Sequence, residues 1–399
     1  MCELSFLEQL LHGVEVEWLV LEDIVELKRG KRLIKSQLEL SGKFAVYQNS
    51  MKPLGYYHVS NTKSDTVFII CAGAAGEIGY SACPFWAADD VYYIASVGRL
   101  NSKYLYYFLL TQKSRILSQV RRASIPRLSK TALDKISIPI PYPDNPEKSL
   151  AIQSEIVRIL DAFTALTAEL TAELSARKKQ YSYYRDHLLS FKEGKVAHLP
   201  MGHENIGKFI RGGSLQKKDF TKSGVGCIHY GQIYTYYGTY AAKTKTFISE
   251  VLAKKCRKAQ SGNLVIATTS ENDEDVCKAV AWLGNNDIAV SSDACIYKHN
   301  LHPKFVSYFF QTESFQSQKR QYITGSKVRR VNADDLAKIL IPVLSSREQA
   351  RIVAMLDQFD TLTTSITEGL PCEIELRQKQ YEYYRDLLFS FPKPETTRH

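Results

Sequence analysis

The sequence predicts an α/β fold of the α+β type. We expect two pseudo-repeated globular domains separated by two long antiparallel coiled-coil helices, with pseudo-two-fold symmetry and the termini close together. Three observations predict this fold. Residues 177–191 (RKKQYSYYRDHLLSF) and 377–391 (RQKQYEYYRDLLFSF) differ at only four of fifteen positions. An apolar seam with alternating three- and four-residue spacing precedes each copy, as in coiled coils. Each seam follows a longer stretch of mixed strand and helix patterns. The chain is therefore one module written twice, with a period too long for a solenoid.

In chain order, each module begins with a globular segment, which we place at residues 1–145 and 197–345. Apolar runs in both segments predict one matching buried strand (67–72 and 263–268) and one matching helix (105–110 and 306–310). A short apolar strand with prolines closes each segment, at 136–143 and 339–346. We therefore expect two domains with one skeleton and different loops.

A long helix completes each copy, at residues 146–196 and 346–392. Ser345 or its neighbour, followed by Glu348, has the spacing of a helix N-cap. Four extra residues near Pro371 have the size of a coiled-coil stutter, and the proline should kink the second helix. The apolar stripes are best buried against each other, although each helix could instead dock on its own domain. The residues expected at this helix-pair or partner interface are Ile156, Phe163, Leu170, Tyr181, Leu188, Leu356, Phe359, Ile366, Tyr381 and Leu388.

Charge and composition limit the classes of function. The 399 residues carry a formal charge of +10, and 20 basic against 12 acidic residues leave +8 within 197–345. A basic surface of this kind suits a polyanion. No run of about 18 apolar residues predicts a membrane span, and the acidic N-terminal segment does not resemble a signal peptide. Eight scattered cysteines, without a C-x-x-C pair or a histidine cluster, predict reduced thiols in the cytoplasm and no metal site.

Three kinds of polar cluster recur at equivalent places in the two copies. The first is basic residues beside glycines, which let a backbone approach a phosphate closely. The second is arginine-rich runs, because arginine suits both phosphate and guanine. The third is tyrosine with amide side chains, which suit adenine. In that order, the residues expected to contact DNA are Lys28, Arg29, Lys31, Arg32, Arg211, Lys217 and Lys218; Arg121, Arg122, Arg127, Lys327, Arg329 and Arg330; and Tyr47, Gln48, Asn49, Tyr230 and Gln232. The prediction depends on the clusters recurring at equivalent positions of the two copies. Any one of these residues alone would fit a solvated surface or a packed core.

Enzyme motifs are missing from the sequence. It contains no P-loop, no Asn-Pro-Pro-Tyr with the F-x-G-x-G of an adenine methyltransferase, and no nuclease (D/E)-x-K at a useful distance from Asp144. Residues 73–79 imitate a glycine-rich nucleotide loop, but we interpret them as a turn between strands. The pattern predicts a binding protein without catalytic residues.

The chain resembles the DNA-specificity subunits of type I restriction-modification systems over almost its whole length. The resemblance depends on the Ile-Pro strand endings (138–141 and 341–343), the I-V-x-x-L-D helices (156–161 and 352–357) and the R-x-K-Q-Y-x-Y-Y-R-D ends. It implies that 1–145 and 197–345 are target-recognition domains, each reading half of a bipartite site on double-stranded DNA. It implies that the helices are spacers that fix the gap and dock methyltransferase subunits, two of them in our expectation, in complexes that also contain motor-nuclease subunits. S-adenosylmethionine, ATP and Mg would then belong to those partners, which would carry out N6-adenine methylation and cleavage.

Two other functions remain open at this point. A structural or regulatory coiled-coil protein that binds RNA or a protein partner would have similar clusters and helices. A fused restriction enzyme would need the catalytic motifs that the sequence lacks.

Overall fold

The computed structural model describes residues 13–191 and 196–392, which form two compact units. Unit 1 comprises the chain up to Glu169 together with the chain from Glu375, and unit 2 comprises Leu170–Ile374. No helix within the described residues is both long and apolar enough to cross a membrane.

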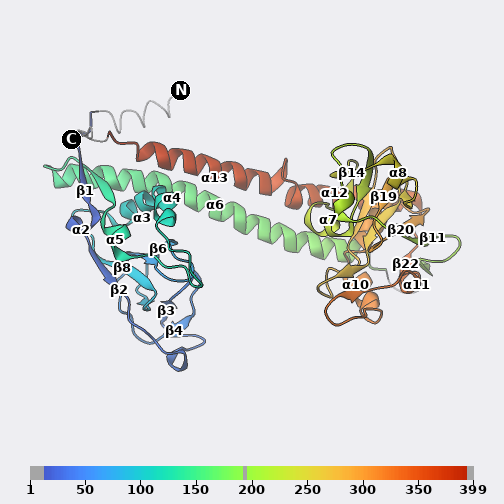
Figure 1. Cartoon of the computed structure of the whole chain (residues 1–399), viewed down its shortest axis with the longest axis horizontal. Coiled ribbons are helices and arrows are strands. Elements are labelled where there is room, and N and C mark those ends of the chain that lie inside the picture. Colours follow the sequence, from blue (N-terminus) through green and yellow to red (C-terminus); the bar gives the residue numbers. More distant parts are fainter. Residues whose placement is uncertain (1–12, 192–195, 393–399) are drawn as a thin grey trace. The chain divides into compact units, whose positions relative to one another are not determined.

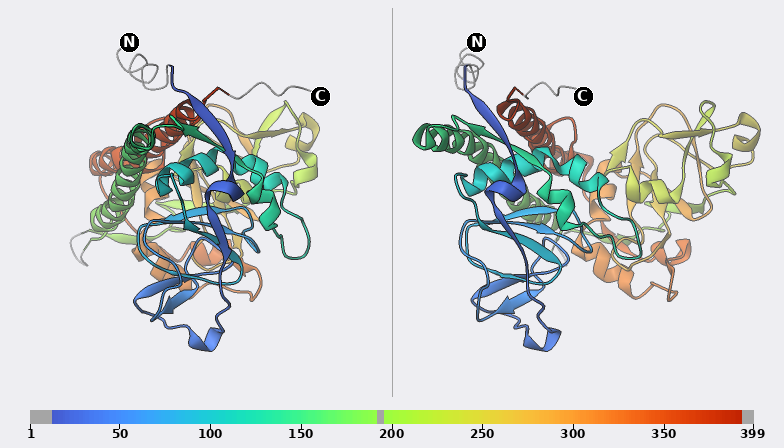
Figure 2. Two further views of the ribbon diagram at one scale, coloured as in Figure 1. Left: turned by 90° about the vertical axis from the view of Figure 1, so that its left-hand side faces the viewer. Right: turned by 60° about the vertical axis from the view of Figure 1, so that its left-hand side comes forward.

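Unit 1 contains three sheets. Its globular elements are β1 (Val16–Val20), α2 (Leu21–Ile24), β2 (Glu26–Arg29), β3 (Phe44–Tyr47), β4 (Gly55–Tyr57), β5 (Thr66–Ile70), β6 (Ile78–Ser81), β7 (Trp86–Ala87), β8 (Val91–Ser96), α3 (Ser102–Thr111), α4 (Lys113–Ser118), α5 (Lys130–Asp134) and β9 (Ser137–Pro141). The strand orders are β2-β8-β5-β6, β4-β3-β7 and β1-β9, and all pairs are antiparallel except β3 with β7. The small sheet β4-β3-β7 lies at the end of the unit away from α6 (Pro146–Leu188) in both ribbon figures (Figure 1, Figure 2).

Unit 2 repeats this plan with additional strands. Its globular elements are β10 (His198–Pro200), β11 (Gly207–Arg211), β12 (Val225–Ile228), α7 (Tyr230–Thr235), β13 (Tyr240–Ala241), β14 (Thr246–Ile248), α8 (Glu250–Ala253), β15 (Lys258–Ala259), β16 (Leu264–Ala267), β17 (Thr269–Ser270), β18 (Ala279–Trp282), β19 (Ile288–Val290), β20 (Ala294–His299), α9 (Pro303–Phe309), α10 (Glu313–Arg320), β21 (Arg329–Arg330), α11 (Ala333–Leu336) and β22 (Leu340–Pro342). The order β11-β20-β16-β18 matches β2-β8-β5-β6, and β14-β12-β19 matches β4-β3-β7, with the parallel pair at the same place. The predicted matching strands (β5, β16), helices (α3, α9) and proline-containing strands (β9, β22) are thus confirmed.

Helix α6 is continuous for 43 residues, and its two parts pack in different units. In unit 1, Phe163 stacks on Tyr384 of α13 (Gly369–Leu388), with 5.3 Å between ring centroids. In unit 2, Tyr184 stacks on Phe359 of α12 (Ser346–Thr364) at 5.5 Å. The first part of α6 meets Tyr384 and its last part meets Phe359, which comes earlier in the chain, so the second long helix runs in the opposite direction to α6. The antiparallel pair is therefore confirmed, and both partner helices also join the cores of the globular parts.

The second long helix is broken rather than kinked. Helix α12 ends at Thr364, and α13 begins at Gly369, where the backbone has φ +78°. A side chain at Gly369 would collide with the carbonyl oxygen of Thr361 at 2.6 Å. The interruption lies just before Pro371, which the sequence predicted as its cause. At the other end of α12, the Ser345 hydroxyl accepts a hydrogen bond from the Glu348 amide, as expected of an N-cap.

The two ends of the described chain meet in unit 1. The Trp18 indole donates a hydrogen bond of 2.8 Å to the carbonyl oxygen of Pro392. Phe389 packs on Tyr104 and Phe108 of α3, with ring centroids 5.0 and 5.6 Å away. This agrees with the expected proximity of the ends, although the terminal residues 1–12 and 393–399 lie outside the described residues.

Candidate nucleic-acid interface

The second basic cluster forms a closed hairpin of seven residues in each unit. In unit 1, the backbone groups of Arg121 and Arg127 exchange hydrogen bonds of 2.9 and 3.1 Å. In unit 2, Thr324 and Arg330 do the same, at 2.9 Å in both directions. The apolar residues between these pairs, Ile125 and Val328, are exposed, so the hairpins have no core of their own and reciprocal backbone bonds define the loop. These two segments, 121–127 and 324–330, are called the basic hairpins below.

Each basic hairpin is attached to the end of the central strand of the main sheet. Leu128, which follows the first hairpin, donates to the carbonyl oxygen of Cys71 at 2.8 Å. Val331, which follows the second, donates to that of Thr268 at 3.2 Å. Since Cys71 follows β5 and Thr268 follows β16, the two hairpins occupy equivalent places.

The first basic cluster reaches the same place from the neighbouring strand. Arg29 at the end of β2 donates through Nε to the carbonyl oxygen of Asp89 at 2.7 Å, and Arg211 at the end of β11 donates to that of Ser292 at 3.3 Å. The glycines that follow take part in close backbone contacts within the protein. A Cβ on Gly30 would lie 2.1 Å from the Ala88 carbonyl oxygen, and one on Gly212 would lie 2.0 Å from that of Ser291. They allow two backbone segments to approach closely just after the strands end, and a phosphate contact there stays a prediction.

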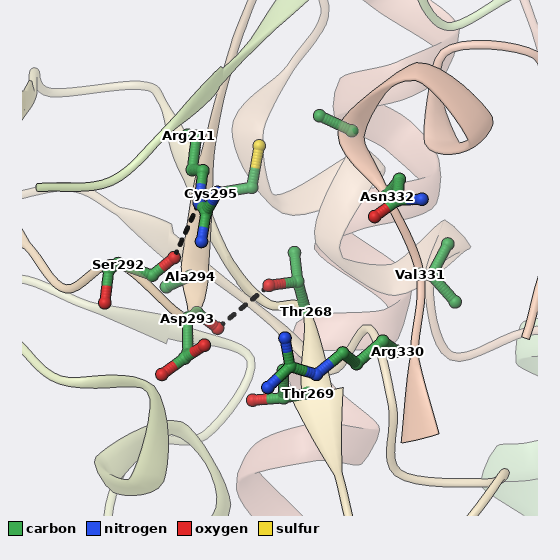
Figure 3. Close-up of a pocket in the computed structure, with 11 residues that line it drawn as sticks. Arg211, Thr268, Thr269, Ser292, Asp293, Ala294, Cys295, Arg330, Val331 and Asn332 are labelled. Carbon is green, nitrogen blue, oxygen red and sulfur yellow. Dashed lines mark hydrogen bonds between the residues drawn. The ribbon is translucent and has the colours of Figure 1, made fainter. Parts of the chain in front are cut away.

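The two clusters meet in each unit. In unit 2, Arg211 and Arg330 line one pocket of about 150 Å³ together with Asp293 and Thr269, and Figure 3 shows their side chains entering it from different segments. In unit 1, burial raises the pKa of the Cys71 thiol to about 11, and the charges of Arg29 and Arg127 both oppose that rise. One arginine from each cluster therefore faces a common point.

The remaining basic candidates form local ion pairs or are mostly exposed. Lys28 forms an ion pair with Glu26 at 2.9 Å. The Arg329 guanidinium pairs with Asp273 at 2.8 Å. The others with mostly exposed side chains are Lys31, Arg32, Arg121, Arg122, Lys217, Lys218 and Lys327.

The third cluster contacts the protein interior more than predicted. Tyr47 packs on Phe68 and Phe85 with ring centroids 4.9 and 5.4 Å away. Gln232, expected to read adenine, is buried: its Oε1 accepts from the His229 amide at 2.9 Å, which caps α7, and its Nε2 donates to Thr246. The Gln232 prediction is wrong, because an amide three residues into a helix satisfies the free N–H groups of its first turn. Gln48 and Tyr230 are half-buried, while Asn49 is exposed.

Nine of the ten residues expected at the helix-pair or partner interface are buried or partly buried. Ile156, Tyr181, Leu356 and Leu388 are buried; Phe163, Leu170, Leu188, Phe359 and Tyr381 are partly buried. Ile366 is the exception within the helix pair, since it lies in the non-helical link between α12 and α13 with 79% of its surface exposed; a contact with a partner stays a prediction. The interruption ends the seam before it reaches this residue.

A duplicated ionic contact joins each globular part to its helix. In unit 1, Asp161 of α6 accepts from Lys103 and from the Tyr107 hydroxyl, both at 2.6 Å. In unit 2, Asp357 of α12 accepts from Lys304 at 2.7 Å and from the Tyr308 hydroxyl at 2.6 Å. The sequence reasoning missed both lysine–tyrosine pairs, although their common K-x-x-x-Y spacing at the start of the matching helices was a visible signal.

The arrangement can bind a polyanion at two equivalent points. Guanidinium and ammonium groups on loops supply charge and directional donors. Among residues 13–191 and 196–392, no group of three or more His, Cys, Asp or Glu side chains could hold a metal ion.

Comparisons with known proteins agree with this reading. The family model of the type I restriction modification DNA specificity domain matches twice, at residues 14–177 and 204–376. The chain is 38% identical to the type I restriction enzyme EcoR124I/EcoR124II specificity subunit of Escherichia coli, over 99% of both chains. It is 32% identical to a putative type I restriction enzyme specificity subunit of Haemophilus influenzae, over 97% of this chain and 98% of that one. The crystal structure of a type I restriction-modification S subunit from M. genitalium has the same fold, with a TM-score of 0.57 and 16% identity over 96% of this chain and 98% of that one.

Proposed function

This chain belongs to the family of type I restriction-modification DNA specificity subunits, and from that premise we propose that each of its units reads one half of a split site on double-stranded DNA. The basic hairpins and the arginines beside them contact the duplex. The helices fix the number of base pairs between the two halves.

One observation carries this proposal: the same arginine-bearing hairpin is attached to the same strand end in both units. A duplicated backbone framework with different side chains suits two DNA-recognition domains of the same fold that recognise different bases. Unit 1 places three exposed arginines on its hairpin, and unit 2 places Lys327, Arg329 and Arg330 there. Phosphate contacts by such residues make the logarithm of the binding constant fall linearly with the logarithm of salt concentration.

The helices supply docking surfaces for methyltransferase subunits. Tyr183 and Tyr383 occupy the same position of the repeated motif, with 65% and 60% of their surfaces exposed. Exposed tyrosines are favoured at the centres of protein interfaces. Two equal patches imply two copies of one partner. Methylation and motor-nuclease activity, with S-adenosylmethionine, ATP and Mg, then belong to the partner subunits of a cytoplasmic complex.

The methylome of the host tests the proposed function. Deleting the gene should remove one split methylation motif and leave every other motif unchanged. In the complemented strain, replacing Arg121, Arg122 and Arg127 with alanine should relax one half of that motif, and replacing Lys327, Arg329 and Arg330 should relax the other. If the deletion changed no motif, or if both triple variants weakened both halves equally, the assignment of one half-site to each unit would be wrong.

A further inference from the structure

The loop that joins β16 to β18 in unit 2 is longer than the matching loop between β5 and β6 in unit 1. The sheet registers align Ile70 with Ala267 and Ile78 with Ala279. Seven residues lie between Ile70 and Ile78 in unit 1, and eleven lie between Ala267 and Ala279 in unit 2. The short loop contains Gly73 and Gly76, whereas the long loop contains the acidic run 271–275 (ENDED). We call residues 271–275 the acidic loop.

A buried lysine holds the acidic loop in place. Lys319 on α10 is fully buried, and its Nζ donates to the carbonyl oxygens of Asp273 (2.8 Å), Glu274 (3.1 Å) and Val276 (2.9 Å). An ammonium group has three N–H donors, so each has an acceptor. Asn272 adds hydrogen bonds to the backbone and the carboxylate of Asp275. Because a buried charge is tolerated only when it is fully paired, the loop and the lysine fix each other.

The fixed loop places one carboxylate against one arginine of the basic hairpin. Asp273 Oδ1 lies 2.8 Å from Arg329 Nε, and Arg329 Nη1 donates to the carbonyl oxygen of Gly325 at 2.5 Å. A guanidinium has five N–H groups, and these two contacts leave three at its Nη1–Nη2 end. The side chain is 34% exposed. The outer end of the guanidinium therefore stays available in a set orientation.

The arginines of the first hairpin are not held in this way. Within the described chain, no carboxylate forms an ion pair with Arg121, Arg122 or Arg127. Unit 1 lacks the acidic loop that would supply one. The two hairpins share a backbone and differ in how tightly an arginine is oriented.

We propose that Arg329 reads a guanine in the half-site of unit 2, and that Asp273, held by Lys319, is its positioning residue. The inference depends on the proposed function and names the ligand of one side chain within it. Guanine presents O6 and N7 acceptors side by side in the major groove, and two parallel guanidinium N–H groups match them. A side chain already held at Nε loses less freedom on binding. The Asp273 carboxylate also repels phosphate oxygens, which opposes contact with the backbone of non-cognate DNA.

Base-analogue binding tests this role in the full chain complexed with its methyltransferase subunits. The probes are duplexes with the methylome-defined site, in which each guanine of the half-site of unit 2 is replaced in turn by 7-deazaguanine, which lacks the N7 acceptor. At one position, the wild type should lose roughly 10- to 150-fold in affinity, which corresponds to about 1.5–3 kcal/mol for one lost hydrogen bond to a charged group. In Asp273→Ala and Arg329→Ala, that loss should shrink to about twofold or less. Glu271→Ala is the matched control: it removes a carboxylate from the same loop, and it should behave as the wild type does.

Each variant should still prefer the correct bases in the half-site of unit 1. This preference shows that the variant is folded and bound to DNA. Three results would overturn the role of Asp273 and Arg329. The Asp273→Ala variant could keep the full guanine preference, the wild type could tolerate every analogue, or Arg329→Ala could weaken all duplexes equally while lowering the salt slope by about one, as a phosphate anchor would. If the wild type preferred no sequence in either half, the proposed function itself would fail, which is a distinct outcome.

Discussion

The strongest stability prediction concerns the tyrosine that joins unit 2 to its helix. Tyr308 is fully buried, and its hydroxyl donates to Asp357 at 2.6 Å, while Lys304 contacts the other oxygen of that carboxylate. Replacing Tyr308 with phenylalanine removes one hydrogen bond to a charged group and leaves the ring packed. Such a bond contributes about 1.5–3 kcal/mol. For a unit of this size, we expect the melting temperature to fall by roughly 3–12 °C.

Calorimetry of the full chain measures this change, and hydrogen exchange in α9 and α12 assigns it to unit 2. Tyr107→Phe should act in the same way on unit 1, because its hydroxyl donates to Asp161. Tyr183→Phe is the control, since 65% of Tyr183 is exposed. A Tyr308→Phe variant that melted within 1 °C of the wild type, with unchanged exchange, would refute the view that this contact holds the globular part to the helix.

Three further predictions follow from buried groups. Gly212→Ala should destabilise unit 2 by about 3 kcal/mol in urea unfolding, because the new Cβ would lie 2.0 Å from a carbonyl oxygen. Gly238→Ala is the control and should be neutral, because a Cβ there would meet no atom within 4 Å. Burial lowers the pKa of His299 from 6.5 to about 4, so the unfolded chain binds more protons between these values and stability falls as pH drops from 6.5 towards 4. In urea unfolding from pH 7 to pH 5, His299→Leu should lose less stability than the wild type; an equal loss would contradict this origin. In native alkylation followed by mass spectrometry, the exposed Cys83 should react first among the described cysteines. Cys277 and Cys295 should react last, because burial raises the pKa of both thiols to about 12. Equal labelling of all three would be inconsistent with the fold.

The repeat made most of the fold predictable. Two copies in register identified β5 with β16, α3 with α9 and both long helices, because apolar periodicity is a local property of the sequence. The interruption of the second long helix at residues 365–368 was predicted only as a kink. Where a helix stops depends on local capping, and here Ser365 accepts hydrogen bonds from the amides of Thr367 and Glu368.

The candidate site was predictable as clusters but not as contacts. The sequence placed Arg29 and Arg127 in separate groups, and only the fold brings one arginine of each group together. Gln232 was misjudged because a helix-capping amide and a base-reading amide have the same sequence signature. Asp273 and Lys319 could not be identified as site residues from the sequence. They lie 46 positions apart, and the loop that brings them into contact has no periodic pattern.

A domain exchange tests the central claim most directly. The segment between β10 and β22 is replaced by the matching segment of the Escherichia coli relative, and the methylome of the host is sequenced. We predict a hybrid motif in which one half changes, the other half persists and the gap between them stays the same. A motif that changed in both halves, or one that did not change at all, would contradict the claim that each unit reads its own half of the site.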